Sequence, residues 1–282
     1  METIQLNNGV SIPTIGFGTY KTSENDTSII RAAIECGYRL LDTASIYNTE
    51  QSTGTAIRLS GIPREEITVT SKVWRNDLGY RETKEAFSNS LKLLGLKYLD
   101  LYLIHWPANA RNFDNWQKTN AETWRAMEEL VEEGKIKSIG VSNFWPDHLE
   151  ALLNSAKIIP AVNQIEFHPG YWQPETTNYC RKSGIILQAW SPLARGRIFE
   201  NKILTKIANH HQKSISQIAL RWSVQHGVIP IPKASGKERM NENLNIFDFL
   251  LSKDEMQLIN RLPEMGFSGE RPDLWPERLA QS

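Results

Sequence analysis

The sequence predicts an α/β protein built as one (β/α)8 TIM barrel domain over residues 1–282. Eight short, apolar, β-rich segments recur along the chain, segments with helical periodicity lie between them, and the chain has 282 residues. Successive apolar segments begin about 30 residues apart, the length of a strand plus its crossover helix. Strands alternating with helices predict a parallel sheet, and eight such units in a chain of this length favour a closed barrel.

The eight predicted strands are continuous apolar runs, as expected for parallel strands that are buried on both faces. In chain order they are IGFGTY from Ile15, YRLLDTA from Tyr38, ITVTSKVW from Ile67, LDLYLIHW from Leu99, IKSIGVSNF from Ile136, AVNQIEFHP from Ala161, GIILQAWSP from Gly184 and GVIPIPK from Gly227. Ahead of them, IQLNNGVSIP predicts a β-hairpin, because Asn8-Gly9 is a strong two-residue turn signal.

Four of the intervening segments have apolar residues at helical spacing: Thr27–Cys36, Thr83–Leu94, Ala121–Val131 and Ser214–Val224. Glycine follows each of them, as is common just beyond the end of a helix. An open, doubly wound sheet is the alternative architecture. It is disfavoured because the first strand-to-helix turn, like the rest of the chain, lacks the G-x-G-x-x-G dinucleotide fingerprint.

The composition narrows the classes of partner. The 32 Lys and Arg residues balance 32 Asp and Glu residues, so the formal net charge is zero. A nucleic-acid or anionic-membrane partner would call for a basic surplus, and no apolar run reaches the length of a membrane span. The N-terminal segment lacks a signal-peptide core, and two cysteines form no disulfide framework. We therefore expect a cytoplasmic monomer with neither a nucleic-acid nor a membrane partner.

Reactive side chains follow three predicted strands. Asp42, Lys72 and His105 each end an apolar run, and Tyr47 lies five residues beyond Asp42. The carboxyl ends of barrel strands meet at one mouth, where barrel enzymes carry their active sites. The four residues together therefore predict a catalytic site. Taken singly they allow other interpretations: Asp42 and Lys72 as a structural ion pair, His105 as a core histidine and Tyr47 as a loop aromatic.

The motifs GYRLLDTASIYNTE, ITVTSKVW, DLYLIHWP, IGVSNF, VNQIEFHP and IPKASGKERMNENL resemble those of the aldo-keto reductases, in particular the small bacterial and yeast-type enzymes. The resemblance runs in family order from Ile4 to about Trp275. It implies a (β/α)8 barrel, an NADPH-dependent oxidoreductase and a small aldehyde or ketone as substrate. It also implies that Asp42, Tyr47, Lys72 and His105 form the catalytic tetrad, with Tyr47 as the proton donor and His105 orienting the carbonyl.

Hydride must come from a nicotinamide cofactor, because no side chain supplies it. A tyrosine pKa near 10 lies about three units above neutral, and we expect the Lys72 ammonium to lower that of Tyr47. Ser142, Asn143 and Gln164 are uncharged hydrogen-bonding groups at neighbouring strand ends, which suits a carboxamide, and the resemblance gives them that role. Trp190 offers a flat face to the nicotinamide; core packing is the other interpretation.

The resemblance extends to the rest of the cofactor. It places Gly18 and Thr19 at the ribose, and Ser191, Leu193 and Arg195 of SPLARGR at the pyrophosphate; Ala194 stands where the family often has glycine. It matches Lys233 and Arg239 to a clamp on the adenosine 2′-phosphate, with Glu242 and Asn243 at the adenine. Ala234 replaces a common phosphate-binding serine, for which Ser235 or Lys237 could compensate. The other interpretation of this stretch is a solvated helix start.

The resemblance lines the substrate pocket with Tyr20, Ile46, Trp74 and Trp106, an aromatic wall suited to a carbonyl compound with an apolar body. It also places a C-terminal loop over the mouth, where Trp275 either covers the site or packs outside the barrel. Two other functions stay open: a non-catalytic nicotinamide-binding protein of the same fold, and an unrelated barrel enzyme. No metal is expected, because the six histidines form no HExxH motif and only His105 and His168 fall at strand ends. Lys72 as a Schiff-base former remains possible by chemistry alone.

Overall fold

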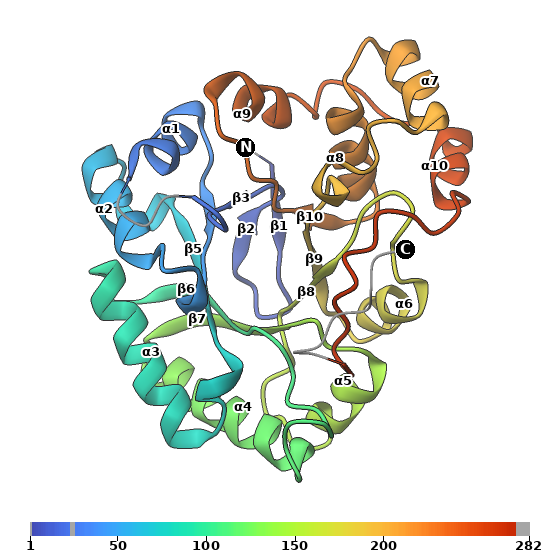
Figure 1. The fold of residues 1–282 in the computed structure, drawn as a ribbon. Helices are drawn as coiled ribbons and strands as arrows, with labels where there is room; N and C mark the ends of the chain where they lie inside the picture. The colour runs from blue at the N-terminus through green and yellow to red at the C-terminus, as the bar shows by residue number, and fades with distance from the viewer. Residues whose placement is uncertain (1, 23–25, 275–282) are drawn as a thin grey trace.

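A closed (β/α)8 barrel is the core of the computed structural model, which describes residues 2–22 and 26–274 (Figure 1). Its eight parallel strands pair in chain order: β3 (Phe17–Gly18), β4 (Leu40–Asp42), β5 (Thr68–Val73), β6 (Leu99–Ile104), β7 (Ile136–Ser142), β8 (Val162–Glu166), β9 (Ile186–Trp190) and β10 (Val228–Pro230). Each lies within one of the eight segments predicted from the sequence.

Backbone hydrogen bonds join the first barrel strand to the last. Gly16 N donates to Pro230 O and Gly18 N to Pro232 O, each over 3.0 Å. Gly16 permits this close approach, because a Cβ at that position would lie 2.6 Å from the Ile231 side chain. The closed barrel therefore has no free sheet edge between β3 and β10.

An outer ring of helices covers the strands (Figure 1). The helices are α1 (Ser28–Cys36), α2 (Glu50–Ser60), α3 (Tyr80–Leu94), α4 (Trp116–Glu132), α5 (Pro146–Leu153), α6 (Pro174–Lys182), α7 (Lys202–His211), α8 (Ile215–Gln225), α9 (Lys237–Leu244) and α10 (Lys253–Asn260). The four predicted helices correspond to α1, α3, α4 and α8. Gly37 and Gly95 end α1 and α3 in left-handed conformations, with φ of 110° and 66°.

Helix α2 was not among the helices predicted from the sequence, and a glycine in its interior shows why. Gly54 sits in its interior, where glycine is unfavourable on intrinsic propensity. A Cβ on Gly54 would lie only 1.8 Å from the carbonyl oxygen of Leu94, at the end of α3. The glycine is therefore required by close helix packing, a tertiary reason that outweighs its poor helix propensity.

The N-terminal hairpin closes the end of the barrel opposite the carboxyl ends of the strands. Strands β1 (Thr3–Gln5) and β2 (Ser11–Pro13) pair antiparallel, as predicted. Leu6 and Ile12 join the barrel-interior cluster with side chains such as Leu101. The turn is one residue longer than expected: Leu6 N donates to Val10 O and Gly9 N to Leu6 O, leaving Asn7, Asn8 and Gly9 as the loop. A left-handed Gly9 (φ 86°) fits this three-residue turn.

Strand register brings the predicted site residues to one level at the opposite end. Gly18 on β3 pairs with Asp42 on β4, and Ser142 on β7 pairs with Gln164 on β8. Within the described part of the chain, none of the helices combines the length and hydropathy of a membrane span.

Candidate active site

A cavity of about 650 Å³ opens at the carboxyl ends of the strands. Most of the residues predicted for the site line it: Gly18, Tyr20, Asp42, Ile46, Tyr47, Trp74, His105, Trp106, Ser142, Asn143, Gln164, Trp190, Ser191, Leu193, Arg195 and Lys233. Lys21, Pro192, Ile231, Pro232 and Glu270 also line it and were not predicted. Trp275 lies outside the described residues. The structure therefore brings these residues together at one end of the barrel.

The floor of the cavity rests on a buried ion pair. Lys72, near the end of β5, is completely removed from solvent, and its Nζ donates to Asp42 Oδ1 over 2.6 Å and to Thr43 O over 2.9 Å. Gln164 Nε2 donates to the other carboxylate oxygen of Asp42 over 2.8 Å. Burial lowers the pKa of Lys72, while Asp42 acts in the opposite direction. Both charges are held in fixed positions because each has several partners.

Tyr47 and His105 meet above this pair. Tyr47 ends a short 3-10 turn, Ser45–Tyr47, that follows β4, and His105 directly follows β6. Tyr47 Oη and His105 Nε2 are 3.3 Å apart, a hydrogen bond, and Lys72 Nζ lies 5.1 Å from the centre of the Tyr47 ring. The four residues singled out from the sequence are therefore one cluster.

The protonation of this cluster differs from the sequence-based expectation. The pKa of Tyr47 is raised well above its usual value, first by burial and then by the charge of Asp42. The expected net lowering of the Tyr47 pKa is therefore wrong for this structure, because desolvation of the phenol and the charge of Asp42 outweigh the effect of the Lys72 ammonium. Burial and the nearby Lys72 together put the pKa of His105 well below its usual range. The phenol and the imidazole are thus both neutral near pH 7.

Amide side chains form the wall on the β7–β8 side. Asn143 Nδ2 donates to His105 O over 3.0 Å, and Ser142 Oγ donates to Gln164 O over 2.7 Å. Trp190 Nε1 donates to Asn143 Oδ1 over 2.7 Å, which fixes the indole at the cavity edge. A flat ring beside uncharged hydrogen-bonding groups fits a planar heteroaromatic ring that carries a carboxamide.

The loop after β9 adopts unusual backbone geometry. Ser191, Ala194 and Arg195 have φ values of 48°, 49° and 54°, in the left-handed region that favours glycine. In the family that the sequence resembles, glycine is common at the position of Ala194. The positive φ at this position explains that preference. Arg195 projects to the cavity, where its guanidinium lies 5.9 Å from the centre of the Trp190 ring.

The C-terminal tail reaches the mouth, as predicted, through residues 263–274. Glu270 lines the cavity, and Arg195 Nη2 donates to its Oε1 over 3.0 Å. The buried carboxylate of Glu166 anchors the tail, because it accepts from Ser268 N over 3.0 Å and from Ser268 Oγ over 2.7 Å. The sequence carried no signal for Glu270, since a tail position is set by contacts with distant segments.

The residues predicted for the 2′-phosphate gather around the start of α9, beside the end of β10. Lys233 lines the cavity and donates to Ser235 Oγ over 2.7 Å. Arg239 is exposed on α9, whereas Lys237 pairs with Glu35 of α1 over 2.8 Å. Ser235 and Lys237 were the two residues suggested to replace the family's phosphate-binding serine. Ser235 lies beside Lys233, whereas Lys237 is already engaged in an ion pair with Glu35.

The remaining predicted cofactor residues lie outside the cavity lining. Thr19 is buried and its hydroxyl donates to Asp42 O over 3.1 Å. Glu242 accepts a hydrogen bond from Ser214 Oγ at the start of α8. Asn243 is a buried residue of α9.

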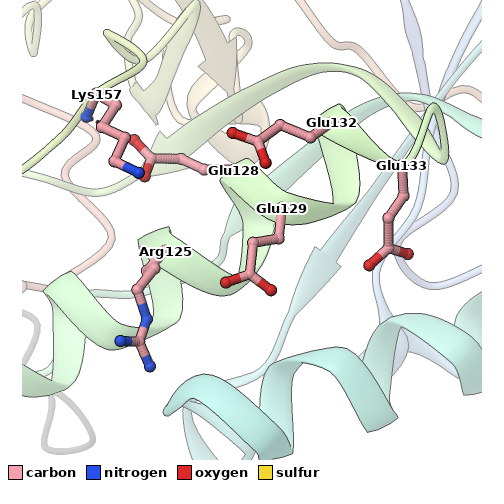
Figure 2. Close-up of a pocket in the computed structure, with 6 residues that line it drawn as sticks. All are labelled: Arg125, Glu128, Glu129, Glu132, Glu133 and Lys157. Atoms are coloured by element: carbon pink, nitrogen blue, oxygen red, sulfur yellow. Dashed lines mark hydrogen bonds between the residues drawn. The ribbon is translucent and has the colours of Figure 1, made fainter.

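A second hollow lies on the outside of α4 (Figure 2), lined by Arg125, Glu128, Glu129, Glu132, Glu133 and Lys157. Its carboxylates hold the fold together. Glu128 accepts from the backbone N–H groups of Lys157 and Ile158, over 2.7 and 2.9 Å. Lys84 of α3 bridges Glu129 and Glu133, each over 3.0 Å. The polar groups at the carboxyl ends of the strands, in contrast, converge on an open cavity.

Comparison with known proteins points to one family. The model of the Aldo/keto reductase family matches residues 14–264. Glyoxal reductase of Bacillus subtilis is 48% identical over 274 residues, covering 96% of each chain, and 9,11-endoperoxide prostaglandin H2 reductase of Trypanosoma cruzi is 45% identical over 275 residues, covering 96% of this chain and 94% of its own.

Solved structures agree in fold. An aldo/keto reductase from Brucella melitensis superposes with a TM-score of 0.87 at 44% identity, covering 92% of this chain and 98% of its own. A mutant of Gox0644 crystallised in complex with NADPH superposes with a TM-score of 0.90 at 36% identity, covering 96% of this chain and 97% of its own.

Proposed function

This chain belongs to the aldo/keto reductase family, and we propose that it reduces aldehydes and ketones to alcohols with NADPH, using Tyr47 as the proton donor. The observation that carries the proposal is the hydrogen bond between Tyr47 Oη and His105 Nε2, 3.3 Å long, at the floor of the cavity. A proton donor and a second polar group at one point are what a carbonyl oxygen needs as it becomes an alkoxide.

A bound nicotinamide supplies the hydride, and the chain supplies the proton and its placement. Tyr47, neutral because its pKa is raised, carries the proton that the carbonyl oxygen takes up. His105 Nδ1 is buried and finds no hydrogen-bond partner among the described residues. The tautomer with its proton on Nε2 avoids a buried donor without an acceptor, and Nε2–H can then donate to the same oxygen. Asp42 holds Lys72 beneath the phenol, where its positive charge stabilises the phenolate left after proton transfer.

Residues around the cavity fit the cofactor. Trp190 gives the nicotinamide a flat face, and Ser142, Asn143 and Gln164 offer hydrogen-bonding groups to its carboxamide. At the far side, Lys233 and the exposed Arg239 provide two cations for the 2′-phosphate of NADPH. A Lys point charge and an Arg fork both suit a dianionic phosphate. The NADPH complex of a structural neighbour at 36% identity supports the choice of NADPH over NADH.

The substrate end of the cavity is aromatic and apolar. Tyr20 packs on Tyr47 with ring centres 4.9 Å apart, and Trp74 lies 5.1 Å from the His105 ring. Ile46 and Trp106 line the same cavity. We propose small aldehydes and dicarbonyl compounds as substrates, and a relative named glyoxal reductase makes glyoxal the first compound to test.

The proposal is tested by single-turnover reduction of glyoxal and an aromatic aldehyde, followed by NADPH absorbance. Tyr47→Phe should slow the reaction by about 10²–10⁴-fold, the usual contribution of a general acid, without weakening NADPH binding. Tyr80→Phe is the matched control, because its hydroxyl bonds to Glu129 far from the cavity. A loss of only a few-fold in Tyr47→Phe would remove Tyr47 as the acid, and an inactive wild-type protein across the panel would overturn the function.

A further inference from the structure

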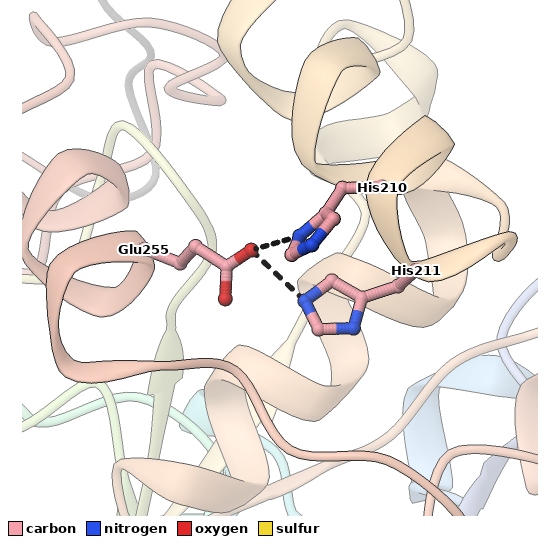
Figure 3. A group of neighbouring side chains, drawn as sticks. All are labelled: His210, His211 and Glu255. Carbon is pink, nitrogen blue, oxygen red and sulfur yellow. Dashed lines mark hydrogen bonds and ion pairs between the residues drawn. The ribbon is translucent and has the colours of Figure 1, made fainter.

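A cluster of two imidazoles and a carboxylate, drawn in Figure 3, lies between α7 and α10, two helices on the outside of the barrel (Figure 1). None of its three residues lines the cavity of the proposed active site. His210 and His211 are the last two residues of α7, and Glu255 lies in the first turn of α10. The side chains approach one another from the two helices, and neither the proposed reaction nor the barrel core uses them. The cluster is therefore a candidate for a binding site separate from the proposed active site.

The donor atoms of the cluster converge. His210 Nδ1 lies 3.0 Å and His211 Nε2 lies 2.9 Å from the same oxygen, Glu255 Oε1. The three atoms are all within 4.8 Å of one another. The rings of the two histidines are 4.9 Å apart and tilted at 59°, so they present their nitrogens from two directions. One small ion can reach all three atoms with modest side-chain movement.

The carboxylate is held in place from behind. Ser252 N donates to Glu255 Oε2 over 2.7 Å, and Glu255 N donates back to Ser252 Oγ over 3.2 Å, forming the capping box that starts α10. Outer-shell hydrogen bonds of this kind orient ligating carboxylates in metal sites. Oε1 is thus held facing the two histidines, while Oε2 accepts the hydrogen bond from the Ser252 backbone N–H.

Exposure leaves room for a further ligand. The side chain of His210 is 75% exposed, whereas those of His211 and Glu255 are 15% and 12% exposed. A site of three protein ligands with one side open to water matches the coordination of Zn²⁺ by imidazole and carboxylate. Calcium and magnesium prefer all-oxygen ligand sets, so the two nitrogens select a transition metal.

The lysine that follows the two histidines is already paired with an acid. Lys213, two residues beyond His211, pairs with both oxygens of Asp248 over 2.9 and 2.7 Å. Glu255 supplies a carboxylate to the cluster, and its Oε2 already accepts from Ser252 N. The cluster therefore offers a cation one carboxylate oxygen and the lone pairs of two imidazole nitrogens.

We propose that His210, His211 and Glu255 bind one divalent transition-metal ion, Zn²⁺ in the first instance, and that the ion clamps α7 to α10. In the tautomers with the ring protons on the outward nitrogens, the facing lone pairs and Oε1 coordinate the ion without any change in oxidation state. Helix α10 leads directly into residues 263–274, the tail that reaches the cavity. Metal binding at this clamp should therefore stabilise the C-terminal part of the molecule.

Isothermal titration of the full-length, tag-free protein with ZnCl₂ tests the proposal. We expect one Zn²⁺ per chain and a rise of a few degrees in Tm under saturating Zn²⁺. Because outer-shell changes alone cost about 10–100-fold in affinity, removal of a ligand in His210→Ala or His211→Ala should weaken binding by at least about 100-fold. Glu255→Gln should also weaken it, while its amide oxygen can still accept from Ser252 N.

The matched control is Asp254→Asn, which removes a carboxylate from the same turn of α10 but none of the three ligands. It should bind Zn²⁺ like the wild type. Circular dichroism without metal identifies any variant that fails to fold, and the d–d absorption of Co²⁺ reports directly on the ligands in those that do. Unchanged Zn²⁺ affinity in folded His211→Ala, or equal loss in Asp254→Asn, would overturn the proposal, as would a wild type that does not bind.

Discussion

Lys72 Nζ lies 2.6 Å from Asp42 Oδ1, and the Lys72 side chain is entirely buried beneath the floor of the cavity. An ion pair taken out of water is costly to form, and more costly to break on one side only. The pair therefore links stability and chemistry: the same contact that keeps the ammonium in the core also sets it 5.1 Å from the Tyr47 ring.

Asp42→Asn should destabilise the protein by about 3–5 kcal/mol, because it leaves the buried Lys72 ammonium without its counter-charge. The double variant Asp42→Asn with Lys72→Met should recover much of this loss, since it buries no unpaired charge. Urea unfolding of the two single variants and the double variant gives the coupling free energy. Additive losses would show that the two charges do not depend on each other.

The raised pKa of Tyr47 and the lowered pKa of His105 predict a flat pH profile for reduction. Tyr47 keeps its proton below its raised pKa, and His105 stays neutral above its lowered one, so the single-turnover rate should change little between about pH 6 and pH 9. Alcohol oxidation needs the phenolate and should speed up as pH rises. A reduction rate that falls with an apparent pKa near neutrality would indicate that the phenol is far more acidic than this structure implies.

Arg239→Ala should raise the KM for NADPH by about 10–100-fold, because one charge-assisted hydrogen bond contributes about 1.5–3 kcal/mol. The KM for NADH, which lacks the 2′-phosphate, should stay nearly the same. Lys237→Ala is the comparison, because Lys237 pairs with Glu35 and should have a smaller effect on NADPH. Equal changes with both cofactors in Arg239→Ala would contradict the assignment.

Ser268→Ala should loosen the tail without unfolding the barrel. The Ser268 hydroxyl donates to the buried Glu166 carboxylate over 2.7 Å, so its removal should raise amide exchange in residues 265–270 by about tenfold or more. Tm should change little. Ser155→Ala, which removes a helix-end hydroxyl bonded to Leu152 O, provides the control. Unchanged exchange at the tail would mean that other contacts hold it.

The local pattern of the chain was enough to predict the barrel. Apolar runs such as LDLYLIHW and helix-ending glycines such as Gly37 are local features of the sequence, so they can be recognised without knowing the fold. Helix α2 was missed because the reason for Gly54 is the backbone of Leu94, forty residues away. The three-residue hairpin turn differed from the expected one because the pairing of Leu6 with Val10, and not the Asn8-Gly9 signal alone, sets its length.

The sequence by itself determined which residues end the strands, and therefore that Asp42, Tyr47, Lys72 and His105 would share one end of a barrel. Only the tertiary structure decided their electrostatics, because desolvation depends on everything packed around a group. Burial raised the pKa of Tyr47 although Lys72 lies beneath it. Contacts between distant segments were equally beyond sequence reasoning: Glu270 entering the cavity, and Glu255 meeting His210 and His211, depend on where the chain returns in space.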